Sequence, residues 1–165
     1  MEVLALIPAL LFIIAASAHL QADLPDDALY VSPEGDDAWS GLLAEPAPDG
    51  GDGPLATLAT ARDRARALRA SLDADRTEPL VIVLRAGRYA LPEPLTLGPE
   101  DSGTVASPLV WMAYPGEEPV ISGGVELAGF EETPEGWWRA PYPDELPDTI
   151  SLYVNGVRRG RPRRP

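Results

Sequence analysis

The stretch that decides the fold is Leu80-Val81-Ile82-Val83-Leu84, and Arg85-Ala86-Gly87-Arg88-Tyr89 follows it. The five apolar residues are too few for a helix and rich in β-branched side chains, which is typical of a strand buried on both faces. Gly87 supplies the conformational freedom for a turn before Tyr89. The stretch therefore predicts a central strand followed at once by a turn.

Further short apolar runs follow this strand, each bounded by Pro, Gly, Asp or Ser. They lie at residues 95–97, 109–113 and 120–121, and the prolines stand between the runs rather than inside them. That placement suits strands, because proline cannot donate a ladder hydrogen bond. No helical pattern separates the runs, so a doubly wound α/β sheet is disfavoured. A coiled parallel sheet and a self-contained antiparallel sandwich both remain open.

One helix is predicted before the central strand. Its apolar residues recur at spacings of three and four, with Thr57 as the N-cap; they are Leu58, Ala61, Ala65, Leu68 and Leu72. The other face is charged, and Asp63 can pair with Arg66 at i, i+3, whereas Arg62 and Arg66 repel each other at i, i+4. A helix of this length needs a surface on which to bury its stripe.

The C-terminal part of the chain predicts a hairpin and contains two adjacent tryptophans. Asn155-Gly156 between two short runs is a strong signal for a two-residue turn. Strand alternation places either Trp137 or Trp138 inward, and the other is a candidate for stacking on a sugar ring. Trp111 lies in an apolar run and is predicted to be part of the core.

Residues 1–22 are predicted to be a signal peptide, with cleavage after Ala18 or after Ala22. The apolar run of residues 3–18 is shorter than the roughly 20 residues of a membrane-spanning helix. Glu2 departs from the usual basic start, and an uncleaved N-terminal anchor is the alternative. The expected protein is secreted, extracellular or periplasmic, without stable membrane insertion after cleavage.

The composition excludes several kinds of chemistry. The chain has no cysteine and a single histidine, His19 near the leader, so disulfides, thiolate zinc sites and a Ser-His-Asp triad are not expected. A formal net charge of −13 argues against nucleic acid as a partner. The chain ends in a basic cluster of Arg158, Arg159, Arg161, Arg163 and Arg164. We predict that it lies in a loop after the hairpin and meets acidic groups of the same protein; contact with the carboxylates of an acidic polysaccharide is the alternative.

The order of these features resembles the beginning of right-handed parallel β-helix proteins of the pectin-lyase-like superfamily. The resemblance covers nearly all of the chain after the leader and rests on segments 30–36 (YVSPEGD), 39–41 (WSG), 52–58 (DGPLATL), 61–62 (AR), 81–89 (VIVLRAGRY), 95–97 (LTL), 100–104 (EDSGT), 114–124 (YPGEEPVISGG) and 152–156 (LYVNG). It implies a mainly β fold in which residues 23–165 form the cap helix and first coils of a β-helix, an incomplete solenoid whose remaining coils are missing.

The resemblance also implies a function. Enzymes of this superfamily are polysaccharide lyases and glycoside hydrolases that carry their catalytic residues on later coils, so no catalytic residue can be assigned here. We expect a polysaccharide or other glycan as the partner. The alternative is a non-catalytic cell-surface or adhesive β-helix protein.

Three pairs of adjacent carboxylates are candidates for hydrolytic or metal-binding roles: Asp36-Asp37, Glu100-Asp101 and Glu117-Glu118. Adjacent side chains on a strand point to opposite faces, so solvated turns are the favoured interpretation. Asp36, Asp37 and Asp52 are the candidate calcium ligands. No metal or cofactor site is predicted in this segment, although calcium is possible in the full-length protein.

Overall fold

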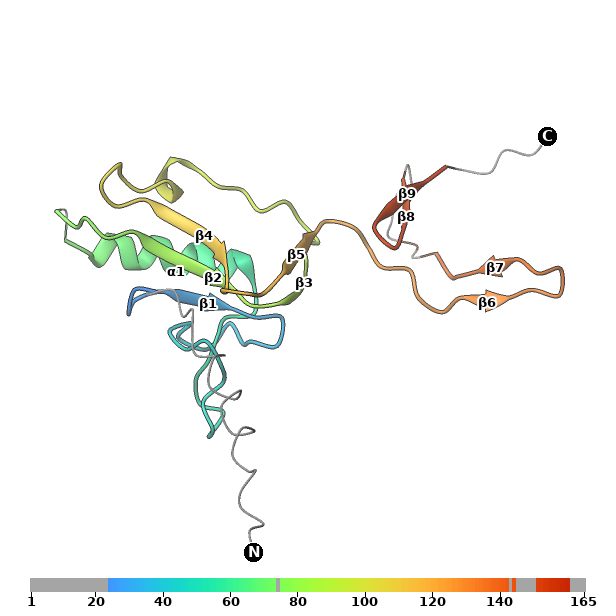
Figure 1. Ribbon diagram of the computed structural model, residues 1–165, viewed down its shortest axis with the longest axis horizontal. Coiled ribbons are helices and arrows are strands. Elements are labelled where there is room, and N and C mark those ends of the chain that lie inside the picture. Colours follow the sequence, from blue (N-terminus) through green and yellow to red (C-terminus); the bar gives the residue numbers. More distant parts are fainter. Residues whose placement is uncertain (1–23, 74, 143, 145–150, 161–165) are drawn as a thin grey trace, which may run out of the picture. The chain divides into compact units, whose positions relative to one another are not determined.

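The computed structural model describes residues 24–73, 75–142, 144 and 151–160 (Figure 1). The predicted signal peptide with both cleavage positions, and three arginines of the C-terminal cluster, lie outside these residues. The chain divides into two units, residues 1–124 and residues 125–165, which are taken in turn.

The first unit is built on two parallel sheets. Strands β1 (Leu29–Val31), β2 (Leu80–Leu84) and β4 (Leu109–Ala113) form one sheet in the order β1-β2-β4, and β3 (Gly87–Ala90) pairs with β5 (Pro119–Ser122) in the other (Figure 1). Among the described residues of this unit, every pair of named strands is parallel. The antiparallel sandwich is therefore wrong for the first unit, because β2 lies between two parallel neighbours.

The two sheets repeat along the chain. Leu80 of β2 pairs with Leu109 of β4, 29 residues later (109 − 80). Gly87 of β3 pairs with Pro119 of β5, 32 residues later (119 − 87). Two such turns are fewer than the three or so repeats that make a stable solenoid, so the β-helix itself stays a prediction.

The predicted helix is present as α1 (Leu58–Ser71). The Thr57 hydroxyl accepts a hydrogen bond from the Thr60 amide at 3.2 Å, which confirms the N-cap. At the other end, the Leu72 amide donates to the carbonyl oxygens of Leu68 and Arg69. The helix buries Leu58, Ala61 and Ala65 in the main hydrophobic core, and Leu68 packs against it.

All five residues of β2 are buried, as predicted. Leu80, Ile82 and Leu84 belong to the same core cluster as the buried face of α1, whereas Val81 and Val83 form a second cluster with Ala28. The alternation of a strand thus gives apolar neighbours on both faces. Trp111 is half-buried and packs against the helix-side cluster, so it contributes to the core from the edge strand.

The turn after β2 depends on Gly87. Its φ of +133° lies in a region that L side chains avoid, and a Cβ there would come within 2.7 Å of Pro33 Cγ. The turn directs Tyr89 into the core, where its hydroxyl lies 2.8 Å from the carbonyl oxygens of Val31 and Arg85. Burial raises the pKa of Tyr89 to about 12.

In the second unit, the residues that the structure describes form two antiparallel hairpins. Strands β6 (Glu131–Glu132) and β7 (Trp138–Arg139) form one, and β8 (Leu152–Val154) and β9 (Val157–Arg159) form the other. Asn155 and Gly156 both have positive φ, which confirms the predicted Asn-Gly turn.

The inward placement of one of the adjacent tryptophans is wrong for the described structure. Trp137 is 71% exposed and Trp138 is 65% exposed. The hairpin that carries them is only two strands wide, and none of its residues is buried, so neither side of it faces a core.

Candidate functional site

Two of the three candidate calcium ligands hold the loop that precedes α1. The Asp37 carboxylate accepts hydrogen bonds from the amides of Ala56 and Thr57, both at 2.9 Å, and from the Thr57 hydroxyl at 2.8 Å. Partial burial alone would raise the pKa of Asp37, but these hydrogen bonds outweigh it and hold the pKa below its usual value. Asp37 therefore anchors the start of α1.

Asp52 does similar work further along the same loop. Its carboxylate accepts from the Ser40 amide at 2.7 Å, the Ser40 hydroxyl at 2.8 Å and the Gly53 amide at 2.8 Å. The Ser40 amide contributes most to lowering the pKa of Asp52. Asp36 accepts a hydrogen bond from the Ala38 amide at 2.8 Å. Within the described residues, no three His, Cys, Asp or Glu side chains are grouped as a metal site requires.

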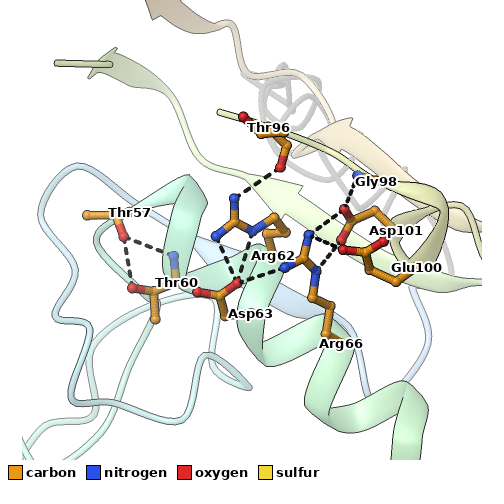
Figure 2. A network of polar contacts seen from close by, with 9 residues as sticks. All are labelled: Thr57, Thr60, Arg62, Asp63, Arg66, Thr96, Gly98, Glu100 and Asp101. Atoms are coloured by element: carbon orange, nitrogen blue, oxygen red, sulfur yellow. Dashed lines mark hydrogen bonds and ion pairs between the residues drawn. The ribbon is translucent and has the colours of Figure 1, made fainter. Parts of the chain in front are cut away.

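The second carboxylate pair ties α1 to the connection between β3 and β4 (Figure 2). Asp101 lies in the short 3-10 helix η1 (Pro99–Asp101). Both of its oxygens lie 2.7 Å from the Arg66 guanidinium, and the Gly98 amide donates to it at 2.6 Å. The prediction of a solvated turn is wrong for Asp101. Its side chain is only 3% exposed, because Arg66 reaches across from α1 to pair with it.

The same network includes the charged face of α1. Arg66 also lies 3.1 Å from Glu100 and 3.7 Å from Asp63, which confirms the predicted i, i+3 pair. Arg62 donates to Asp63 at 2.9 Å and to the Thr96 carbonyl at 3.0 Å, so Asp63 stands between the two guanidiniums that were expected to repel. The Arg66 hydrogen bonds lower the pKa of Asp101 to about 2. This network holds α1 against the connection between β3 and β4.

In the third carboxylate pair, Glu117-Glu118, Glu117 forms an ion pair with Arg85. The guanidinium of Arg85 contacts both Glu117 oxygens at 2.9–3.0 Å and lies 4.6 Å from the centre of the Tyr114 ring. It also donates to the Ala44 carbonyl, and the Ala86 amide donates to Glu117. The hydrogen bond from Arg85 is the main cause of the lowered pKa of Glu117.

Around this ion pair lies a group of half-buried aromatic and apolar side chains. The Tyr30 and Tyr114 rings are 6.5 Å apart at 51°, and both residues are half-buried against Val81 and Val83 together with Met112. We call Tyr30, Arg85, Met112, Tyr114 and Glu117 the outer-face cluster, because they lie on the side of the sheet away from the main core. The Arg85 guanidinium lies over the Tyr114 ring and also pairs with Glu117, so aromatic and charged groups meet on this side of the sheet.

The sequence alone did not predict the outer-face cluster. The parallel register brings its residues together, because it aligns Tyr30 with Val83 and Val83 with Met112. The Tyr114 amide then donates to the Leu84 carbonyl at 2.8 Å, which places Tyr114 beside Arg85. No local pattern gives that register.

A cleft of about 380 Å³ lies between the end of α1 and residues 99–107. Its charged groups are of both signs and most of them are engaged. Arg76 binds Asp27 at 2.8 Å, Glu100 binds Arg66, and Arg69 donates to the Ser107 carbonyl at 3.0 Å, although its Nη2 is buried without a partner. The cleft therefore favours neither an anion nor a cation.

The remaining sequence candidates are spread over the chain. Trp39 is half-buried beside Gly53, where a Cβ would come within 2.5 Å of its ring. Arg158 and Arg159 are exposed and lie in strand β9, not in the loop predicted for them. In the part of the chain that the structure describes, no helix is both long and apolar enough to cross a membrane.

No protein-family model matches the chain, and the search of curated proteins found no match. Among solved structures, a glycoside hydrolase is similar, with 34% sequence identity and a TM-score of 0.66. The match covers 79% of this chain and 21% of the glycoside hydrolase, so this chain spans about a fifth of its length. At a coarse level, the fold and sequence described above are therefore like those of a stretch of a carbohydrate-active enzyme.

Proposed function

We propose that this chain is the N-terminal cap and first coils of a right-handed parallel β-helix, in a secreted protein that cleaves or binds polysaccharide. Glycoside hydrolysis is the first choice of reaction, ahead of polysaccharide lysis. The observation that carries the proposal is the repeated parallel register of β2 with β4 and β3 with β5, in a chain 34% identical over most of its length to a glycoside hydrolase.

The two ends of the larger sheet support a coil that begins here and continues. Next to β1, Leu55 forms a parallel bridge with Val31, and α1 covers the core. At the opposite edge, β4 consists of the uncharged residues Leu-Val-Trp-Met-Ala, all half-buried. Natural sheets protect free edges with charges, prolines or a covering element. An uncharged five-residue edge is what a further parallel strand would pair with.

The handedness follows from a general rule and not from a measured angle. Connections between parallel strands of one sheet are right-handed in about 98% of cases. The connection from β2 to β4 passes through β3 and η1 and has no long helix. A coil without crossover helices fits a β-helix better than an α/β sheet.

We assign the reaction to later coils, and the carboxylates of this segment support that assignment. Glycoside hydrolysis uses two carboxyl groups flanking the scissile bond. Asp37, Asp52, Asp101 and Glu117 are all held by amides, hydroxyls or guanidiniums, and each has a lowered pKa. A general acid needs a raised pKa, so these groups suit structural roles. The side chains of Tyr30, Met112 and Tyr114 in the outer-face cluster are the glycan contact that we assign to this segment.

Export is part of the proposal. The apolar run of residues 3–18 with small residues at 16–18 fits a cleaved leader, and the absence of cysteine is neutral toward an oxidising compartment. Edman sequencing of the secreted product tests this point. A mature N-terminus at His19 or Asp23 supports it, and a product that begins at Met1 contradicts it.

The test of function uses the full-length gene product on a panel of neutral and acidic polysaccharides. Release of reducing ends without an unsaturated product indicates a hydrolase, and an unsaturated uronate indicates a lyase. Binding without cleavage favours the non-catalytic alternative. A protein that neither cleaves nor binds any polysaccharide overturns the proposal. The 165-residue chain serves as the control, and we expect it to be inactive.

A further inference from the structure

We propose that the hairpins β6-β7 and β8-β9 are the first strands of a separate antiparallel domain, whose apolar surface is covered by later strands of the same polypeptide. This inference rests on the proposed function in one respect, since it requires the longer chain. It adds an interaction surface on the second unit and names its occupant.

The first step is the break in the repeat. Since β2 and β4 begin 29 residues apart, a third strand of that sheet is expected near residue 138 (109 + 29). A strand does occur there, Trp138–Arg139, but it pairs antiparallel with Glu131–Glu132. The next strand, β8, likewise pairs antiparallel with β9.

Two glycines end the first unit, and a Cβ on the second, Gly124, would meet only Ser122 Oγ, at 3.5 Å. Gly123 and Gly124 follow β5 directly, and a Cβ on Gly123 would meet no atom within 4 Å. The division into two units falls after Gly124. A pair of glycines between the two units fits a crossing point between two architectures.

The second step is that the hairpins have no core of their own. Of the described residues 125–142, 144 and 151–160, none is buried. Large apolar side chains are nevertheless frequent there and exposed: Val125, Phe130, Trp137, Trp138, Tyr142, Leu152, Tyr153, Val154 and Val157. Isolated two-stranded hairpins are marginal in water, so these need a covering layer.

Further strands are the partner that best fits the exposed apolar surface of these hairpins. Leu152, Tyr153 and Val154 are consecutive in β8 and all exposed, so apolar groups stand on both faces of that hairpin. A glycan would stack on the aromatic faces but would leave the leucine and the valines exposed to water. A layer on each side and a neighbour along each edge are what additional strands provide. The similar glycoside hydrolase has 79% of its length outside the match (100 − 21), which is ample chain for such strands.

Hydrogen exchange followed by mass spectrometry tests the inference, on the full-length gene product and on the 165-residue chain in parallel. We expect amides in residues 131–139 and 152–159 to exchange roughly 100-fold more slowly in the full-length protein than in the short chain. Residues 80–84 of β2 serve as the internal control and should be protected in both.

Each other pattern has a definite meaning. Protection of 109–113 without protection of 131–139 and 152–159 in the full-length protein overturns this inference, while the β-helix proposal stands. Protection of the two hairpins already in the short chain also overturns it, since either the unit is self-sufficient or, if the protection rises with concentration, a second copy covers it. Loss of protection at both 109–113 and the hairpins in the full-length protein overturns the inference and the β-helix together.

Discussion

Replacing Leu58 by alanine tests whether α1 seals the core of the parallel sheets. Leu58 is 2% exposed and belongs to the core cluster that contains Leu80, Ile82 and Leu84. The substitution removes three carbon groups at about 0.8 kcal/mol each, or about 2.4 kcal/mol of transfer free energy. An incompletely relaxed cavity raises the expected loss to about 3–4 kcal/mol. Urea unfolding followed by circular dichroism measures it.

Leu97→Ala is the matched control, because it removes the same groups from a side chain that is 51% exposed. We expect it to lower the free energy of unfolding by less than about 1 kcal/mol. The slope of the unfolding free energy with urea should be unchanged in both variants. If Leu58→Ala costs no more than Leu97→Ala, the stripe of α1 does not seal the core and the capping role is wrong.

Three further predictions concern the turn and the buried polar contacts. Gly87→Ala should lower the free energy of unfolding in urea by about 1–3 kcal/mol, because φ is +133° and the new Cβ meets Pro33. Gly116→Ala is the control, with φ of +80° and open space, and it should cost less. Equal costs would show that the contact with Pro33 is unimportant. Tyr89→Phe should cost about 1–3 kcal/mol through the buried carbonyl oxygens of Val31 and Arg85, and the phenol absorbance of Tyr89 in the parent chain should titrate near pH 12; a titration near pH 10 would contradict its burial. The pKa of Asp101 is lowered from 3.8 to about 2, so its contribution to stability is present above pH 3.8 and is lost as the pH falls toward 2; Asp101→Asn should therefore flatten the stability profile in that window, and an unchanged slope would show that the ion pair with Arg66 does not form.

Local patterns predicted the elements that depend on neighbours in sequence. The helix stripe from Leu58, the buried run of β2 and the Asn155-Gly156 turn were all confirmed. Each has a signal that repeats within a few residues, such as a period of 3.6 or a turn that demands positive φ. The capping oxygen of Thr57 belongs to the same class.

Contacts between distant segments were beyond the sequence patterns. Arg66 and Asp101 are 35 residues apart, and nothing near Asp101 indicates that a helix will supply its partner. The same holds for Arg85 and Glu117, which meet only because β2 and β4 are in register. Acidic pairs were therefore interpreted as solvated turns, which is wrong for Asp101.

The adjacent tryptophans show a different failure. Alternation on a strand assigns one of two neighbours to a core only if a core lies on one side. The hairpin of Trp137 and Trp138 has none in the described structure, so both remain exposed.

The central claim is that the first unit is the capped beginning of a parallel coil whose next strand pairs with β4. An experimental structure of the full-length gene product tests this most directly, at the free edge of Leu109–Ala113. The account predicts a strand parallel to β4, from later in the chain, with ladder hydrogen bonds along that edge. An antiparallel partner there, or an edge left open to solvent, would contradict it.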